Sequence, residues 1–278
     1  MNPPKELLMD EPSILDYTIK WVKDYFKPFE NKKAIVGLSG GSDSTLTAYI
    51  CQKALGKDNV FGLIMPAEST PEEDVKDAEE VAAALGIKWR KIDINKVVKD
   101  VEDLDPEVTD EKNRVTRANI KARLRMLLLY MEANKTGAIV AGTDDRSEHY
   151  LGYYTKYGDG GVDINVPEHL YKTQVIQLLS YIGENDRLKI FTKVAKKPPS
   201  PQLWKGQTAE NELNVKYEDI DRVLYNMNEK GFKEAKKLAE KTDIGETQIN
   251  HIISIITGNK HKNMLPPSPP VTYFNKKG

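Results

Sequence analysis

One stretch decides the fold, and it reads Ala34-Ile35-Val36-Gly37-Leu38-Ser39-Gly40-Gly41-Ser42-Asp43-Ser44. An apolar, β-branched run passes into glycines and hydroxyl residues, and a helical pattern follows at 45–55. This order predicts a buried strand, a tight turn and the N-terminus of a helix. Glycines let the backbone approach a ligand closely, and the free N–H groups of a helix N-terminus favour an anion. Asp43 would repel a phosphate unless a cation lay between them, so the loop predicts a phosphate together with a divalent metal.

Two other glycine-rich nucleotide loops are excluded. The sequence contains no G-x-x-x-x-G-K-[ST] segment, so the loop is not a Walker A loop. It contains no G-x-G-x-x-G after a strand, so the dinucleotide-binding fingerprint is also missing. The remaining alternative is a surface turn, which the strand before the loop, the helix after it and the enclosed Asp43 all disfavour.

The composition is that of an ordinary globular protein. Its 278 residues suffice for one α/β domain, alone or with a helical appendage. A formal net charge of −1 does not indicate binding to nucleic acid or to an acidic membrane. Residues 1–30 carry charges throughout and no stretch is apolar for long enough to cross a bilayer, so neither a signal peptide nor a spanning segment is expected. The single cysteine, Cys51, is expected in the core, and such cysteine usage fits a cytoplasmic protein.

Alternating strand and helix patterns predict a doubly wound α/β fold. The β-α-β-α-β order of the N-terminal half requires a mainly parallel sheet with helices on both faces. Ligands bind beyond the carboxyl ends of the strands in such sheets, which is where residues 39–44 would lie. The expected strands are 34–38, 59–66, 89–94 and 138–141.

The other patterns predict helices and irregular stretches. An amphipathic helix at 14–26 is expected to pack on the sheet or on a second subunit. Thr70 is expected to cap a helix that begins at Pro71, and 217–258 should hold two or three C-terminal helices. A long helix at 116–134 would bury a stripe of Ile120, Leu124, Leu127, Leu128 and Met131. The remaining expectations are a helix at 172–182, loops at 148–167 and 196–214, and an extended tail at 259–278.

The loop resembles S-G-G-x-D-S, the pyrophosphate-binding loop of ATP pyrophosphatases, which cleave ATP between its α and β phosphates. Several enzyme types carry this loop, among them GMP synthetases, asparagine synthetases, argininosuccinate synthetases and tRNA thiolases. The acceptor must therefore be read from the rest of the chain.

Further segments resemble the NAD synthetase family over 34–266. Asn119-Ile120-Lys121-Ala122-Arg123-Leu124-Arg125-Met126 is similar to its N-x-x-A-R-x-R-M helix, and Gly142-Thr143-Asp144 followed by Glu148 is similar to its G-T-D…E segment. Residues 152–165 resemble its G-[FY]-x-T-K-[FY]-G-D-G-x-x-D-I-N block. The same order continues with Lys172-Thr173, Pro199-Ser200 and His261-Lys262. The chain departs from the family at Ala209 and Asn214, where Asp and Gly are usual, although asparagine tolerates a left-handed conformation.

The resemblance implies a Rossmann-like fold of the adenine nucleotide alpha hydrolase type, with C-terminal helices. It also implies that Asp43 and Glu148 hold Mg²⁺ and that Asp43, Lys172 and Asp159 act in catalysis. The residues implied to bind ATP, the co-substrate, are Gly37, Leu38, Ser39, Gly40, Gly41, Ser42, Asp43, Ser44, Thr143, Lys172 and Ser200. The residues implied to bind deamido-NAD are Arg123, Lys156, Asp163, His261 and Lys262.

The implied reaction is ammonia-dependent NAD synthesis in two steps. The nicotinate carboxylate of deamido-NAD attacks the α-phosphorus of ATP, and ammonia then displaces AMP from the adenylate, with Asp159 or Asp163 orienting ammonia or accepting a proton. Only some 33 residues precede the first strand, so one synthetase domain without a glutaminase domain is expected. Family members are homodimers with the deamido-NAD site at the interface, so a homodimer is expected, without nucleic-acid or membrane partners.

Two alternatives stay open. One is another adenylating enzyme of the same loop class, such as a tRNA thiolase or a GMP synthetase subunit. A thiolase would favour a basic surface or extra cysteines, and the sequence has neither. The other is a regulatory nucleotide-binding protein without turnover, against which the joint presence of Asp43 and Glu148 argues.

Overall fold

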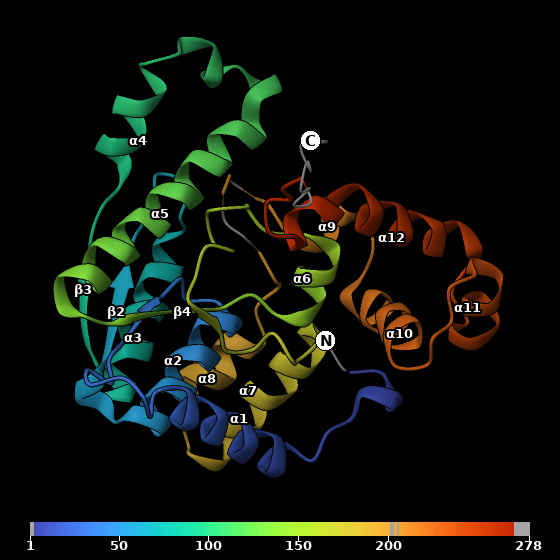
Figure 1. Cartoon of the computed structure of the whole chain (residues 1–278), viewed down its shortest axis with the longest axis horizontal. Helices are drawn as coiled ribbons and strands as arrows, with labels where there is room; N and C mark the ends of the chain where they lie inside the picture. The colour runs from blue at the N-terminus through green and yellow to red at the C-terminus, as the bar shows by residue number, and fades with distance from the viewer. Residues whose placement is uncertain (1–2, 201–202, 205, 270–278) are drawn as a thin grey trace, which may run out of the picture.

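A five-stranded parallel sheet forms the centre of the molecule (Figure 1). The computed structural model describes residues 3–200, 203–204 and 206–269. The strand order is β3-β2-β1-β4-β5, and every neighbouring pair is parallel. This arrangement confirms the predicted doubly wound α/β fold. The strands are β1 (Ala34–Gly37), β2 (Val60–Ile64), β3 (Lys88–Lys91), β4 (Ile139–Gly142) and β5 (Ile164–Asn165).

β1 lies in the middle of the sheet, and its position places the loop that follows it. Ala34 is in register with Val60 on one side and with Ile139 on the other. Successive side chains of a strand point to opposite faces, and Ile35 and Val36 accordingly join different core clusters on the two faces. The loop after β1 therefore leaves the carboxyl edge of the sheet at its centre, between β2 and β4.

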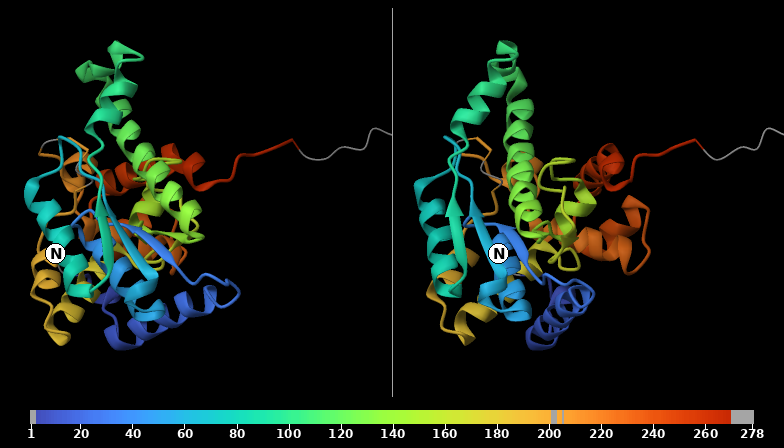
Figure 2. Two further views of the ribbon diagram at one scale, coloured as in Figure 1. Left: turned by 90° about the vertical axis from the view of Figure 1, so that its left-hand side faces the viewer. Right: turned by 60° about the vertical axis from the view of Figure 1, so that its left-hand side comes forward.

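Helices cover both faces of the sheet. One layer holds α1 (Glu11–Tyr25), α2 (Ser42–Leu55), α3 (Glu72–Leu85), α7 (Lys172–Asn185) and α8 (Lys189–Ala195), whose apolar side chains share one core cluster. The opposite face is covered by α4 (Asn95–Glu102) and α5 (Arg114–Thr136). Figure 2 shows α5 rising well beyond the sheet, with α4 beside its upper part. The predicted helix at 14–26 is α1, and it packs on α2 and α7 in the first layer.

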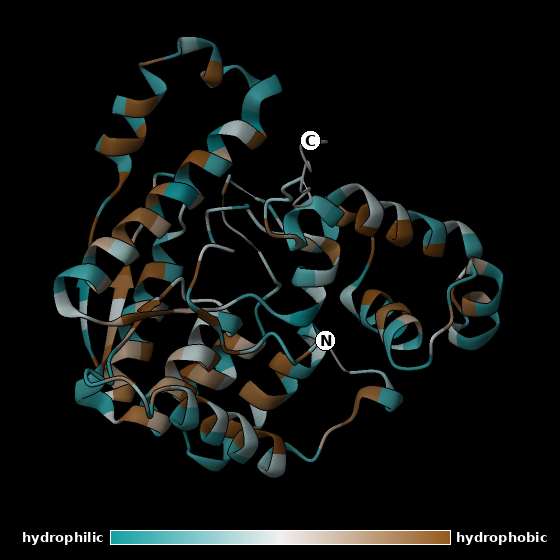
Figure 3. Cartoon of the chain, viewed as in Figure 1, coloured by the Kyte–Doolittle hydropathy of each residue, from teal (hydrophilic) through white to brown (hydrophobic). Residues whose placement is uncertain are grey.

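A second core lies beside the sheet and is built mainly from helices after residue 145, with Leu7 near the N-terminus added to it (Figure 1). Its apolar side chains, including the fully buried Tyr217 and Val223, face inward, while the outer faces of these helices are mostly hydrophilic (Figure 3). The helices of this core are α6 (Arg146–Leu151), α9 (Ala209–Leu213), α10 (Tyr217–Asn228), α11 (Ala235–Thr242) and α12 (Glu246–Asn259). The last three confirm the C-terminal helices predicted at 217–258.

Several elements were not predicted. β5 has only two residues, too few for a periodic pattern, and α9 lies inside the expected loop at 196–214, of which residues 201, 202 and 205 fall outside the described chain. The part of the tail at 259–278 that the structure describes begins with a 3-10 helix and is extended from 264 to 269. The short 3-10 helices are Lys5–Leu7, Lys57–Asn59, Pro106–Thr109, Glu111–Asn113 and Lys260–Asn263.

Two local predictions were wrong. Thr70 does not cap α3, because Pro71 is the N-cap residue and the Thr70 hydroxyl instead accepts the N–H of Ala67 at 3.1 Å. Leu127 and Met131 are not part of the buried stripe of α5, since 58% and 49% of their surfaces are exposed. Small residues such as Ala118, Ala122 and Ala133 are buried on α5 instead.

Three smaller features agree with the sequence. Cys51 is fully buried. Asn214 has a φ of +52°, the left-handed conformation that the usual glycine would also adopt. No helix in the described part of the chain is both long and apolar enough to cross a membrane.

Candidate active site

Hydroxyl groups of the loop between β1 and α2 make hydrogen bonds within the loop. Ser39 and Ser44 join their hydroxyls at 3.0 Å, and the N–H of Gly41 donates to the Ser39 hydroxyl at 3.2 Å. Gly40 has a φ of +78°, and a Cβ there would lie 2.2 Å from the carbonyl oxygen of Asp74. Glycine is therefore required at this position both by backbone conformation and by the close approach of α3.

A cavity of about 800 Å³ opens at the carboxyl edge of the sheet, where the parallel topology predicts a ligand. Its walls come from the ends of β1, β2 and β4 and from the first turns of α2 and α7. Glu148 and Asp159 also line it. Of the residues expected at the ATP site, those that line the cavity are Gly37, Leu38, Ser39, Gly41, Ser42, Asp43, Ser44, Thr143, Lys172 and Ser200, while Gly40 turns the loop behind them.

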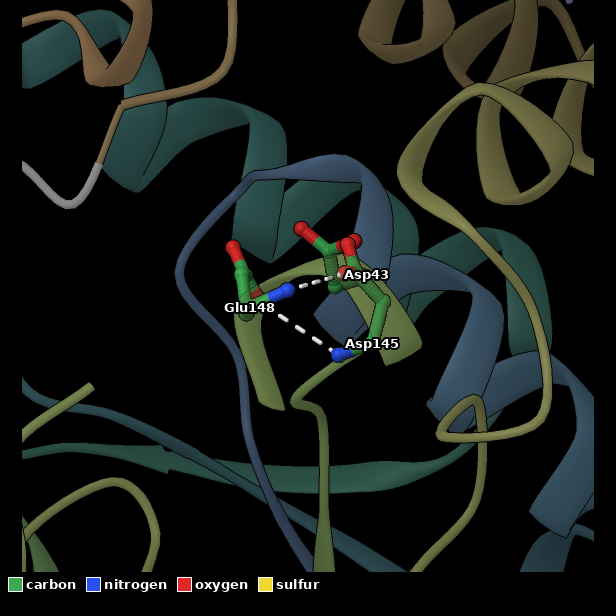
Figure 4. A group of neighbouring side chains, drawn as sticks. All are labelled: Asp43, Asp145 and Glu148. Carbon is green, nitrogen blue, oxygen red and sulfur yellow. Dashed lines mark hydrogen bonds between the residues drawn. The ribbon is translucent and has the colours of Figure 1, made fainter. Parts of the chain in front are cut away.

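Three carboxylates, one from α2 and two from the start of α6, converge in this cavity (Figure 4). One oxygen from each of Asp43, Asp145 and Glu148 lies within 4.8 Å of the others. The Lys172 ammonium contacts all three groups, at 2.9 Å from Asp43, 2.7 Å from Asp145 and 2.8 Å from Glu148. Three acids and one base form a cluster whose excess of negative charge suits a divalent cation.

Helix starts position these four side chains. Asp43 is in the first turn of α2, and Lys172 is the first residue of α7. Asp145 is the N-cap of α6, where its side chain accepts the N–H of Glu148 at 2.9 Å and the Glu148 side chain accepts the N–H of Asp145 at 3.3 Å (Figure 4). This capping box fixes the two carboxylates relative to each other.

Asp145 was not among the site residues expected from the sequence. An acidic residue three positions before Glu148, at the end of a strand, is the signal of a capping box and could have revealed it. Its cap role alone would not have shown that its second oxygen meets Lys172, because that contact joins residues from two separate helices.

Burial sets the charge states of the cluster. Burial, followed by the charge of Asp145, raises the pKa of Glu148 well above its usual value. Burial alone would lower the pKa of Lys172, but Asp145, Asp43 and Glu148 together outweigh it and raise that pKa well above the ordinary range. Lys172 therefore stays an ammonium and lessens the repulsion among the carboxylates.

The backbone of Lys172 is fixed from the C-terminal helices. Asp221 of α10 is fully buried and accepts the Ser147 hydroxyl at 2.5 Å and the N–H of Thr173 at 2.8 Å. The Ser147 hydroxyl in turn accepts the N–H of Lys172 at 3.0 Å. Burial raises the pKa of Asp221 to about 7. Asp221 thus joins the starts of α6 and α7, which carry Glu148 and Lys172.

A second pair of acids, Asp144 and Asp159, also lines this cavity. Burial, followed by the charge of Asp159, raises the pKa of Asp144 well above its usual value. Asp159 accepts the N–H of Thr155 at 2.9 Å, and burial raises its pKa as well. Asp144 belongs to the G-T-D segment, but no role was expected for it. These two carboxyls can hold or accept a proton next to the ATP loop.

The residues expected to bind deamido-NAD lie outside the walls of this cavity. Arg123 is exposed and donates to the carbonyl of Lys156 at 3.4 Å. The Lys156 ammonium donates to the carbonyl of His261 at 2.9 Å, and the Lys262 ammonium donates to the carbonyls of Gly152 and Tyr154 at 2.7 and 2.8 Å. The structure therefore brings Arg123, Lys156, His261 and Lys262 together where the C-terminal 3-10 helix meets the 152–157 loop.

The Asp163 carboxylate makes hydrogen bonds to neighbouring elements of the fold. One of its oxygens accepts the N–H of Val140 at 2.8 Å and the other accepts the Tyr130 hydroxyl at 3.1 Å. These bonds tie the segment before β5 to β4 and α5. Asp163 is the one predicted dinucleotide ligand that the described contacts separate from the other four.

A glycine-serine loop after the central strand, with an acidic cluster at the same sheet edge, defines an ATP-binding α/β protein of the pyrophosphate-loop class. The sequence matches the NAD synthase family model over residues 14–266, and the chain belongs to that family. The predicted family is therefore confirmed.

Relatives of known identity agree with this assignment. An NH(3)-dependent NAD(+) synthetase of Methanocaldococcus jannaschii is 42% identical over 258 residues, which cover 93% of this chain and 96% of the relative. Among solved structures, an NMN synthetase from Francisella tularensis superposes with a TM-score of 0.81 at 30% identity, covering 95% of this chain and 100% of the other. The NH3-dependent NAD synthetase from Campylobacter jejuni, in complex with a nitrate ion, gives 0.76 at 25% identity, with 95% and 100% covered.

Proposed function

We propose that this chain is an ammonia-dependent NAD synthetase, a carbon–nitrogen ligase. A carboxylate oxygen of deamido-NAD attacks the α-phosphorus of ATP, and the bond to diphosphate breaks. Ammonia then attacks the activated carbonyl carbon, the bond to AMP breaks, and a proton leaves the new amide. The observation that carries the proposal is the convergence of Asp43, Glu148 and Lys172 beside the Ser39–Ser44 loop.

The loop and its neighbours would bind ATP. Residues of the loop and of the first turn of α2 line the cavity, and anions bind at such helix starts because N–H groups are free there. Thr143, Lys172 and Ser200 line the same cavity and are proposed as further ATP contacts. Positioning and charge neutralisation are what nucleotidyl transfer needs from a protein.

Mg²⁺ would be held by Asp43 and Glu148. Their carboxylates are hard oxygen ligands within reach of one ion, and Asp145 adds a third oxygen to the same cluster. The ion would supply charge neutralisation for the ATP phosphates. Lys172, which contacts the same carboxylates, keeps them close together when no ion is bound.

Deamido-NAD would be bound by Arg123, Lys156, His261 and Lys262, with Asp163 shaping the nearby loop. Its diphosphate and its nicotinate carboxylate are anionic, and the four other side chains are basic. Asp159 would orient ammonia or accept its proton, since it lines the same cavity and burial raises its pKa above the ordinary value.

The proposal also covers the oligomeric state, the nitrogen donor and the cellular location. We infer a homodimer, supported by exposed apolar side chains such as Leu127 and Met131 on α5 and Trp21 on α1. Free ammonia as donor and a single synthetase domain are supported by the M. jannaschii relative, which is named NH(3)-dependent and is covered over 96% of its length. A cytoplasmic location is supported by the single, buried Cys51.

A second candidate is the amidation of the corresponding mononucleotide. The F. tularensis structure is described as an NMN synthetase, and it covers 95% of this chain. Both substrates carry the same nicotinate carboxylate, so the two activities would share the ATP site and would differ only in how the rest of the nucleotide is bound.

One assay separates these candidates. The protein is mixed with ATP, MgCl₂ and ammonium chloride, together with either deamido-NAD or nicotinate mononucleotide, and NAD, NMN, AMP and diphosphate are measured. NAD formed in equal amounts with AMP supports the proposal, and NMN formed faster than NAD supports the second candidate. AMP formed without either product would contradict both.

A further inference from the structure

A network of ion pairs lies directly behind the ATP loop, between α3 and α8. Lys197, two residues after α8, contacts Asp74 at 2.5 Å and also contacts Asp77. Lys193, on α8 itself, contacts Asp77 at 2.7 Å and Glu73 at 2.9 Å. The Asp77 side chain is 1% exposed, so a buried carboxylate anchors both ammonium groups.

Lys197 reaches the ATP loop, and Lys193 does not. The Lys197 ammonium donates to the carbonyl oxygen of Gly40 at 3.5 Å. Its partner Asp74 has the carbonyl that approaches Gly40 so closely that no Cβ could fit between them. Gly40 is therefore held from two sides, by the backbone of Asp74 and by the side chain of Lys197.

Lys197 also borders the cavity. Three cationic side chains line it among the described residues: Lys172, Arg125 and Lys197. The Lys172 ammonium already contacts the carboxylates of Asp43, Asp145 and Glu148. The Arg125 guanidinium donates to the carbonyl of Met65 at 3.1 Å. Lys197, by contrast, contacts Gly40, which belongs to the loop itself, and the Lys197 side chain is 22% exposed.

We propose that Lys197 is a further determinant of ATP binding, a positioning residue that holds Gly40 of the loop against α3. Its ammonium, which is paired with Asp74 and Asp77, lines the same cavity as the loop that would receive the two outer phosphates of ATP. The inference rests on the proposed function to the extent that the loop binds ATP. The chain continues from Lys197 into Pro198 and Pro199, whose rings fix φ and so restrict the backbone directly after the lysine.

The test compares Lys197→Met with Lys193→Met, because both lysines pair with Asp77 from the same segment and only Lys197 reaches the loop. Binding is measured by calorimetry with Mg²⁺ and three probes: α,β-methylene-ATP, inorganic diphosphate and AMP. In Lys197→Met, the Kd for the ATP analogue and for diphosphate should rise by about tenfold, the size expected for a lost charged hydrogen bond. The Kd for AMP should stay within about twofold, because AMP has no outer phosphates. Lys193→Met should leave all three Kd values nearly unchanged.

Two further measurements separate positioning from folding. Lys197→Arg keeps the charge and should restore most of the affinity for diphosphate, and thermal unfolding of each variant checks that it is folded. Equal losses in Lys193→Met and Lys197→Met would overturn the inference, since both would then act only through the ion-pair network. An equal loss of AMP affinity in Lys197→Met would also overturn it. If the unmodified protein binds the ATP analogue but makes neither NAD nor NMN, the proposed function fails and the comparison of the two lysines still decides the inference.

Discussion

Asp145 and Lys172 form an ion pair in which both side chains are almost completely buried, with 2.7 Å between the carboxylate oxygen and the ammonium and exposures of 0% and 1%. Transferring two charges from water into a protein costs several kcal/mol each, and the cost is offset only when every charge has good partners. Here Asp145 also caps α6, and Lys172 also contacts Asp43 and Glu148. The pair is therefore part of the structure of the site. Different substitutions at Asp145 should lower the free energy of unfolding by different amounts.

Asp145→Asn should destabilise the protein by about 2 kcal/mol, because the cap is kept but a buried ammonium loses one of three carboxylates. Asp145→Ala should cost about 1 kcal/mol more, since it also removes the cap. Asp103→Asn, which breaks the exposed pair with Lys99, should cost less than about 1 kcal/mol. Urea unfolding measures all three, and an asparagine variant as unstable as the alanine variant would contradict the assigned cap.

Asp43→Asn should reduce turnover by at least about a hundredfold, because an amide cannot replace the charge that a bound cation needs. A second readout does not depend on turnover. Mg²⁺ added with α,β-methylene-ATP should raise the midpoint of thermal unfolding of the unmodified protein, and this rise should be much smaller in Asp43→Asn. Asp58→Asn, at an exposed position beyond the other end of α2, is the control. Near-normal turnover in Asp43→Asn would remove the case for a metal at this position.

Gly40→Ala should weaken ATP binding much more than it weakens folding. Gly40 and Gly56 both have positive φ values, +78° and +86°, so an alanine is strained at either site. At Gly56 a Cβ would meet nothing within 4 Å, whereas at Gly40 it would meet the Asp74 carbonyl at 2.2 Å and displace the loop. The KM for ATP should rise at least about tenfold in Gly40→Ala and stay nearly unchanged in Gly56→Ala. Equal effects of the two variants on KM would show that backbone strain alone is responsible.

Asp221 should make stability fall as pH rises from about 4 to about 7. Its pKa in the folded protein is about 7, above the ordinary 3.8, so the folded state binds this proton more tightly than the unfolded state does. The resulting stabilisation is complete below the unfolded pKa and is lost as pH rises through the folded pKa. Asp221→Asn cannot titrate and should show a smaller decrease over this range. Urea unfolding at pH 4.5, 5.5, 6.5 and 7.5 compares the two, and parallel curves would show that Asp221 does not titrate as stated.

The sequence predicted the parts of the fold that have a long periodic pattern. The apolar runs before Gly37 and Gly142 gave two adjacent strands, and the glycine-serine loop gave the position of the cavity. The sequence could not show that Lys172 is buried, because a lysine is normally exposed and its three partners lie on two other helices, α2 and α6.

The wrong and missing predictions also arose because contacts between distant parts of the chain decide which residues are buried or paired. Leu127 and Met131 have the right spacing for a buried stripe, yet α5 extends beyond the sheet, so its small residues are buried against neighbours and these two remain exposed. Asp145 and Lys197 were missed because each acts through contacts with residues distant in sequence. Local patterns carry no information on such pairings.

The bonds from Asp221 to Ser147 and Thr173 also affect when activity can arise during protein synthesis. The ribosome makes the ATP loop early, but α10 emerges only after all the strands and α7 have been made. Until then, the starts of α6 and α7 lack the buried acceptor that aligns Glu148 and Lys172. A chain that ends before α10 therefore carries the residues of the ATP loop but lacks the acceptor that aligns Glu148 with Lys172.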